Sequence, residues 1–296
     1  YYLRMKKRIK LIVNPDSGQR HLDEYLPKVM YILGSNGYAV DVDIVREKDE
    51  IVRALKEASG EADYVYICGG DGTVNLAINE FAGEDMPLGI IPVGTTNVLA
   101  MELSIPINPY EAAYYLANFA EPKAYDVGRI GDNYFGLMVS YGFDAHTISK
   151  VDFNLKKIIG RYAYVLAGFS TLFTYKPEPV YVDLMDGSDP KRGYFVVVGN
   201  ASFYGGAYSM TPLAKMDDGL LDVCIFKEKG VLKSISFAID VLRGTHINGQ
   251  DVEYHQVPRV KLSTKRAPAQ VDGDVSSGEM ESVEIAICPK AVKILV

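Results

Sequence analysis

Three short glycine-rich segments in the first hundred residues contain the residue types from which phosphate-binding loops are built. They read NPDSG (14–18), GGDGTVN (69–75) and GTTN (94–97). Adjacent glycines let backbone N–H groups approach an anion closely, and a helix starting after GGDG would add its own free N–H groups. A carboxylate at Asp71 would repel a phosphate unless a cation lies between them. The segment therefore predicts a magnesium–nucleotide complex.

Two acidic segments in the second half of the chain could carry further chemistry. KMDDGLLDV (215–223) places two carboxylates before a glycine turn, where Asp218 and nearby backbone carbonyls could hold a hard cation. VDGDV (271–275) places Asp272 and Asp274 on either side of a glycine, and in an extended strand both side chains would point the same way. An ordinary turn is the alternative interpretation of each segment, and for VDGDV taken alone it is the favoured one.

The hydrophobic pattern of the first 125 residues predicts the architecture that positions the glycine-rich loops. Strand-like runs at 7–13, 40–45, 63–68 and 88–93 alternate with helical patterns at 22–34, 49–59 and 73–82. This alternation predicts a Rossmann-like α/β domain, a parallel sheet with helices on both faces. Since loops at the carboxyl ends of such strands form the ligand crevice, the three segments should lie at one edge. Thr73 is expected to cap the helix after GGDG.

Beyond residue 125 the pattern changes to closely spaced strands with few helices. The expected strands span 134–143, 179–186, 193–200, 220–226, 259–264 and 282–289. They predict an antiparallel β-sandwich-like domain, interrupted by one helix at about 155–174. The chain thus divides into an α/β nucleotide domain at 5–125 and a β-rich domain at 126–288.

Composition excludes several classes of protein. The net charge of -7, from 38 acidic and 31 basic residues, disfavours nucleic-acid binding. The three cysteines are far apart, which argues against a disulfide scaffold or a zinc ribbon. No signal peptide is recognisable, and the longest weakly polar stretch, 162–175, is shorter than the ~20 residues that cross a bilayer. These features predict a soluble, cytoplasmic protein.

Taken together, these residues resemble the soluble bacterial diacylglycerol kinase family, whose catalytic domain is shared with sphingosine and ceramide kinases. The matching elements follow the family order: NPDSG, GGDGTVN, PVGTTN (92–97), YDVG (125–128), FYGGAY (203–208), TPLAKMDDGLLDV (211–223) and VDGD (271–274). The resemblance implies an ATP-dependent lipid kinase with a nucleotide domain and a lipid domain. It also implies that the C-terminal segment, 289–296, returns to the first domain.

The resemblance also implies roles for particular residues. ATP would be bound by Asn14, Gly69, Gly70, Asp71, Gly72, Thr73, Val74, Asn75, Gly94 and Thr95. Asp71 would act on the catalytic Mg²⁺, and a structural Mg²⁺ would be held by the Asp218 side chain with main-chain oxygens of Lys215 and Leu220. Asp274 falls on the third position of the family's DGE motif, which is its proton acceptor.

Three departures from the family pattern bear on the acceptor. The DGE motif reads DGD, Val98 follows Asn97 where the family usually has aspartate, and Val45 stands where a hydroxyl would contact the nucleotide. Diacylglycerol, phosphorylated to phosphatidic acid, is the favoured acceptor. The alternatives are a ceramide or sphingoid-base kinase, an NAD kinase-like enzyme with a soluble acceptor, and a non-catalytic, nucleotide-binding regulatory protein.

One segment could explain how the protein reaches a lipid. Apolar residues recur at helical spacing between 155 and 173, and the basic residues Lys156, Lys157 and Arg161 lie at the first turns of this stripe. A helix that merely covers the second domain's sheet is the slightly favoured interpretation of this stripe, and the alternative is peripheral contact with an anionic membrane surface. The sequence leaves the oligomeric state, a homodimer included, open.

Overall fold

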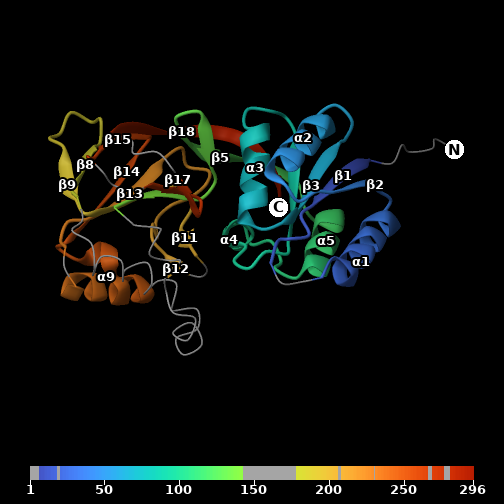
Figure 1. Ribbon diagram of the computed structural model, residues 1–296, viewed down its shortest axis with the longest axis horizontal. Coiled ribbons are helices and arrows are strands. Elements are labelled where there is room, and N and C mark those ends of the chain that lie inside the picture. Colours follow the sequence, from blue (N-terminus) through green and yellow to red (C-terminus); the bar gives the residue numbers. More distant parts are fainter. Residues whose placement is uncertain are drawn as a thin grey trace. The chain divides into compact units, whose positions relative to one another are not determined.

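The computed structural model describes residues 7–18, 21–142, 178–205, 208–229, 231–265, 269–276 and 281–296. The chain folds into two compact units (Figure 1). The first unit comprises Tyr1–Val127 and Pro289–Val296, and the second comprises Gly128–Cys288. The helix expected at about 155–174, with its basic first turns, lies outside the described residues.

A parallel sheet forms the centre of the first unit, as the sequence predicts. Its order is β2 (Ala39–Ile44), β1 (Arg8–Val13), β3 (Tyr64–Gly69) and β4 (Pro87–Pro92). The last residues of β18 (Ser282–Leu295) add a parallel neighbour to β4, where Lys293 pairs with Pro87. The strands are strongly apolar because both faces of a parallel sheet are buried.

Helices cover both faces of this sheet. They are α1 (Leu22–Ser35), α2 (Lys48–Ala58), α3 (Asp71–Phe81), the short α4 (Val98–Glu102) and α5 (Pro109–Asn118). Side chains alternate along β1, so that Ile9, Leu11 and Val13 share one core with α1 and α5. Helix ends follow local sequence signals: Glu47 and Glu50 form a capping box for α2, and the Asn108 side chain caps α5.

The end of the chain is held to the first unit by backbone pairing. Glu121 and Val296 exchange two backbone hydrogen bonds, of 2.9 and 3.1 Å. The Lys290 N–H donates to the Asp126 carboxylate at 2.7 Å, within β5 (Pro122–Ile130). Residues Pro289–Val296 therefore belong to the first unit, although the whole second unit separates them from the rest of it in sequence.

The second unit is built from antiparallel strands, as expected. One sheet has the order β14 (Val252–Val257), β13 (Leu221–Phe226), β10 (Phe195–Gly199), β7 (Met138–Tyr141), β16 (Ala269–Val271) and β17 (Asp274–Ser276). The first residues of β18 pair with β15 (Arg259–Ser263), which pairs with β8 (Val180–Asp183) and then β9 (Lys191–Gly193). The short strands β6 (Asn133–Phe135), β11 (Phe203–Tyr204) and β12 (Tyr208–Ser209) and the 3₁₀ turn His246–Asn248 also belong to this unit.

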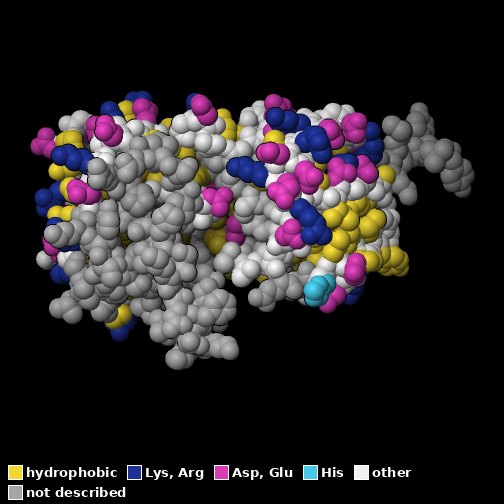
Figure 2. Space-filling view, in the orientation of Figure 1, with side chains coloured by type: hydrophobic (Ala, Val, Ile, Leu, Met, Phe, Trp, Pro, Cys, Tyr) yellow, Lys and Arg dark blue, Asp and Glu magenta, His cyan; other side chains and the backbone are white. Residues whose placement is uncertain are grey.

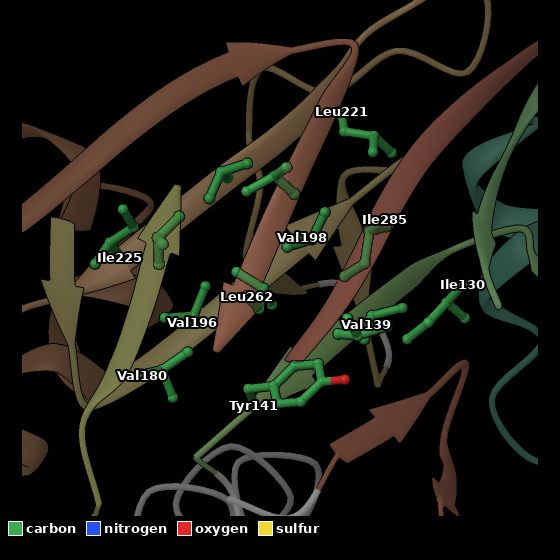
Figure 3. Close-up of a cluster of buried hydrophobic side chains, with 14 of the residues drawn as sticks. Ile130, Val139, Tyr141, Val180, Val196, Val198, Leu221, Ile225, Leu262 and Ile285 are labelled. Atoms are coloured by element: carbon green, nitrogen blue, oxygen red, sulfur yellow. The ribbon is translucent and has the colours of Figure 1, made fainter. Parts of the chain in front are cut away.

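An apolar cluster lies between the two sets of strands in the second unit (Figure 3). Val196, Val198 and Ile225 project from the first sheet, and Leu262 and Ile285 project from β15 and β18. Inward-facing residues at every second position of strands from both sides give the packing of a sandwich. The predicted sandwich-like architecture is thus confirmed.

The structure corrects two details of the predicted second domain. A helix that the sequence reasoning missed, α9 (Val231–Arg243), buries Phe237, Ala238 and Val241 at helical spacing. Its β-branched residues and serines are poor helix formers, so local propensity did not indicate a helix. The strand expected over 134–143 is two strands with different partners, because β6 pairs with β5 whereas β7 pairs with β10 and β16.

The surface of the first unit carries both signs of charge. On the face shown in Figure 2, basic and acidic side chains of this unit are interspersed, and apolar side chains gather over α1 and α5. The exposed apolar side chains of these two helices include Tyr31 on α1 and Tyr114 on α5. Of the helices in the described ranges, none is long and apolar enough to cross a membrane.

Candidate active site

The three glycine-rich loops meet at the carboxyl edge of the first unit's parallel sheet. They follow β1, β3 and β4, which are direct neighbours in the sheet, so they emerge side by side. A Cβ atom added to Gly94 would lie 2.6 Å from the Cα of Gly70. One added to Gly18, whose φ is +76°, would lie 2.1 Å from the Val93 carbonyl oxygen. The loop backbones are therefore in direct contact, with no room for side chains between them.

Asn14 joins the first loop to the helix that follows the second. Its backbone N–H donates to the Cys68 carbonyl at 3.0 Å, and its side-chain amide donates to the Thr73 hydroxyl at 3.1 Å. Thr73 is the third residue of α3, and the N-cap is Gly70, which makes no side-chain cap bond. The prediction that Thr73 caps this helix is wrong; its hydroxyl instead fixes the Asn14 side chain.

The Asp71 carboxylate is held by the turn after β4. One carboxylate oxygen accepts the Thr96 hydroxyl at 2.8 Å, and the other accepts the Leu99 N–H at 3.1 Å. Asp71 is the first residue of α3 and is half-buried. Sequence reasoning missed Thr96 and Leu99 as partners of Asp71, although the GTTN motif drew attention to this turn.

Asn97 is a second residue of this turn that the sequence reasoning passed over. Its backbone is left-handed, with φ 51° and ψ 47°, and its side-chain amide donates to the Gly94 carbonyl at 2.9 Å. The residue is buried, and its Oδ1 has no hydrogen-bond partner. The left-handed conformation, which asparagine tolerates better than most residues, produces the sharp bend between Gly94 and α4.

The other residues predicted to contact the nucleotide differ in their exposure and in the bonds that their polar groups already make. Gly72 and Thr95 are exposed, and Asn75 is half-buried with its side-chain oxygen bonded to Asn79. The Val74 side chain is buried, and its N–H already bonds to the Gly70 carbonyl at 3.1 Å. Val74 therefore packs α3 in place and presents no free polar group.

In the second unit, Asp218 lies in an exposed turn. One of its oxygens accepts the Leu220 N–H at 3.0 Å, around Gly219 with φ +76°. Lys215 is exposed and Leu220 half-buried. Within the described ranges, no three His, Cys, Asp or Glu side chains gather into a metal-binding cluster. A cation here would rest on one carboxylate and main-chain oxygens, a donor set of oxygens that fits a hard ion such as Mg²⁺.

A buried carboxylate, Asp222, lies four residues beyond Asp218. It accepts the Tyr254 hydroxyl at 2.6 Å and the Gln256 side-chain amide at 3.1 Å, while its second oxygen is buried without a partner. Burial raises its pKa to about 6, and the nearby Asp218 charge acts in the same direction. The Tyr254 hydroxyl also accepts the Leu213 N–H, so this group ties the loop before Asp218 to the sheet.

Asp272 and Asp274 differ in structure and surroundings. Asp272 and Gly273 have φ values of 47° and 97° and form the two-residue turn between β16 and β17, in which Val271 pairs with Asp274. The segment is therefore not extended, and the arrangement expected for a strand does not form. The Asp272 carboxylate accepts the backbone N–H groups of residues 136, 137 and 138 at 2.7–2.9 Å, whereas Asp274 is exposed.

Comparison with known proteins agrees with this arrangement over both units. Residues 8–130 match the family described as diacylglycerol kinase catalytic domain, and residues 137–296 match the YegS C-terminal NAD kinase beta sandwich-like domain. A protein of Chromohalobacter salexigens named "Probable lipid kinase YegS-like" is 35% identical, covering 89% of this chain and 86% of that protein. The diacylglycerol kinase of Bacillus subtilis is 29% identical, covering 90% of each.

Solved structures give the same answer for the fold. A crystal structure of a diacylglycerol kinase from Bacillus anthracis matches with a TM-score of 0.79 and 26% identity, covering 97% of this chain and 96% of that one. An NAD kinase from Archaeoglobus fulgidus, at 10% identity and a TM-score of 0.51, shares the fold alone. The family matches span both units, and the relatives named above are lipid or diacylglycerol kinases. The chain therefore belongs to the diacylglycerol kinase and YegS-like family and is an ATP-dependent lipid kinase.

Proposed function

We propose that this chain transfers the γ-phosphoryl group of ATP to the hydroxyl group of diacylglycerol, which yields phosphatidic acid. The observation that carries the proposal is the direct contact of the Gly70 and Gly94 backbones beside the carboxylate of Asp71. Phosphoryl transfer needs positioning and charge neutralisation more than covalent chemistry. Backbone without Cβ atoms next to one carboxylate is suited to both.

The chain's own groups account for binding of the ATP phosphates. The N-terminus of α3 has no side-chain cap, so its first N–H groups and the helix dipole are available to an anion. Gly70 and Gly94 present backbone without Cβ atoms. We assign the nucleotide to Asn14, Gly94, Thr95 and the segment 69–75, within which Val74 has a packing role.

Asp71 would hold the catalytic Mg²⁺, which when bound neutralises phosphate charge. The fit rests on the carboxylate itself: it accepts two hydrogen bonds, and an ionised carboxylate has about four acceptor positions. Its orientation is fixed before any ligand arrives, which lowers the cost of organising the site. We assign the second, structural Mg²⁺ to Asp218 with the main-chain oxygens of Lys215 and Leu220.

Asp274 is our candidate for the proton acceptor. In the transfer, the substrate hydroxyl oxygen forms a bond to the γ-phosphorus, the bond to the β–γ bridging oxygen breaks, and the hydroxyl proton passes to the Asp274 carboxylate. The exposed position of Asp274 leaves it accessible to a substrate, whereas three N–H donors occupy Asp272. The proposal includes a cytoplasmic enzyme that contacts the membrane surface peripherally, because its acceptor resides there.

A lipid panel tests the proposal. The chain is incubated with labelled ATP, Mg²⁺ and vesicles containing diacylglycerol, monoacylglycerol, ceramide or undecaprenol, with NAD as a soluble acceptor and the Asp274→Asn variant as the matched control. We expect labelled phosphatidic acid from the wild type and none from the variant. Product from another acceptor alone would replace diacylglycerol as the substrate. ATP binding without product from any acceptor would support a regulatory protein.

A further inference from the structure

The two bonds to the Asp71 carboxylate come from one turn that is remote in sequence. The Thr96 hydroxyl and the Leu99 N–H lie 25 and 28 residues beyond Asp71, in the segment that runs from Gly94 into the first turn of α4. β3 and β4 are adjacent parallel strands, so the helix after one and the turn after the other start side by side. Asp71 is half-buried, and each carboxylate oxygen has one donor.

The direction of this carboxylate is unusual for its position in a helix. An aspartate in the first turn of a helix commonly turns back to accept the helix's own free N–H groups. The N-cap of α3 is Gly70, which has no side chain to do so, and the Asp71 carboxylate bonds to the neighbouring turn instead. The same two bonds therefore leave the helix N-terminus open to an anion and fix a negative charge beside it.

From this geometry we propose that Thr96 is a positioning residue for Asp71. Its hydroxyl holds the carboxylate away from the N-terminus of α3, in the orientation in which it binds the cation of a magnesium–nucleotide complex. The inference rests on the proposed nucleotide site and not on the identity of the acceptor lipid. Leu99 acts through its backbone, so Thr96 is the member of the pair that a substitution can remove.

Loss of the Thr96 hydroxyl should affect metal-dependent binding selectively. With only the Leu99 N–H left, the carboxylate can rotate toward the free N–H groups of α3 and compete with the phosphates. Hydrogen bonds to charged groups contribute enough that losing one should weaken binding of the magnesium–nucleotide complex by about 10- to 100-fold. Binding of the metal-free nucleotide, in which Asp71 is not needed, should change by less than about threefold.

The experiment compares Thr96→Val, Thr96→Ser and the wild type by calorimetric titration with a non-hydrolysable ATP analogue, in Mg²⁺ and in EDTA. Thr96→Val removes the donor at nearly constant volume, and Thr96→Ser keeps it. The matched control is Thr264→Val. Thr264 lies in the second unit, and its buried side-chain hydroxyl has no hydrogen-bond partner. We expect weakened binding only for Thr96→Val in Mg²⁺, with Thr96→Ser and Thr264→Val close to the wild type. Thr96→Ala removes the same hydroxyl without risk of overpacking and should reproduce the result if Thr96→Val does not fold.

Several outcomes would overturn the role of Thr96. These are wild-type affinity in Thr96→Val and Thr96→Ala, equal weakening in Mg²⁺ and EDTA, a Thr96→Ser variant as weak as Thr96→Val, or a wild type whose affinity is indifferent to Mg²⁺. Product formation from the lipid panel is scored separately. If the variants show the expected binding pattern but the wild type phosphorylates no diacylglycerol, the proposed acceptor is refuted and the role of Thr96 is supported.

Discussion

The contact between Gly70 and Gly94 yields the sharpest quantitative prediction. Gly94 does not have a positive φ, so alanine can adopt its backbone conformation, and only space decides the outcome. The alanine Cβ would lie 2.6 Å from the Gly70 Cα and 2.8 Å from the Asn97 Oδ1. The Asn97 side chain can rotate away, but Gly70 is backbone. Since carbon atoms pack at about 3.5–4.0 Å, the two loops must separate by roughly 1 Å.

This separation should damage binding more than folding. Overpacking of this kind costs about 1–3 kcal/mol, so Gly94→Ala should fold with a Tm lowered by several degrees. A displacement of about 1 Å in a preorganised site can cost on the order of 100-fold in activity. We expect the Kd of the magnesium–ATP analogue to rise at least tenfold and kcat with diacylglycerol to fall further.

Calorimetric titration and thermal denaturation of the same samples separate the two effects. Gly34→Ala is the matched control: Gly34 lies in α1, has a negative φ and has no atom within 4 Å of its added Cβ. That variant should gain about 0.5–1 kcal/mol of stability and bind ATP normally. If Gly94→Ala binds the analogue as tightly as the wild type does, the contact between these loops does not shape the phosphate site.

Three further predictions concern the second unit. Asp274→Asn should abolish phosphorylation and leave ATP affinity within a few-fold of the wild type, and activity retained in this variant would exclude Asp274 as the proton acceptor. Asp272→Ala should instead lower the free energy of unfolding by about 2–4 kcal/mol, because three backbone N–H groups lose their acceptor. Asp218→Ala should lower the Tm and abolish the stabilisation of the wild type by Mg²⁺, and a wild-type Tm unaffected by Mg²⁺ and EDTA would eliminate the structural cation. Burial lowers the pKa of His246, so the unfolded chain binds the proton more readily, and stability should be lost as pH falls below about 6.5. Chemical denaturation between pH 8 and 5 should show a smaller loss for His246→Gln, and equal losses would show that His246 does not contribute.

The architecture could be read from the sequence because its signals are local. Helical and strand periodicity within windows of ten to fifteen residues located α1, α2, α3 and the strands β1 to β4 to within one or two residues. The rule that adjacent parallel strands open at one edge then places the loops after β1, β3 and β4 together. α9 escaped because its local propensity is weak and its helical conformation depends on burying Phe237 and Val241 against the sheet.

The glycine-rich motifs, and with them the family and the enzyme class, were determined by the sequence alone, because backbone approach to phosphate requires these residue types in one short segment. The partners of the acidic side chains were decided only by tertiary structure. Asp71 bonds to Thr96 and Leu99, and Asp272 bonds to N–H groups more than 130 residues earlier in the chain. A carboxylate accepts from whichever donors packing brings within about 3 Å, and no local pattern records which donors those will be. The sequence therefore specifies which groups can do the chemistry, and the packing of neighbouring strands specifies how each one is held.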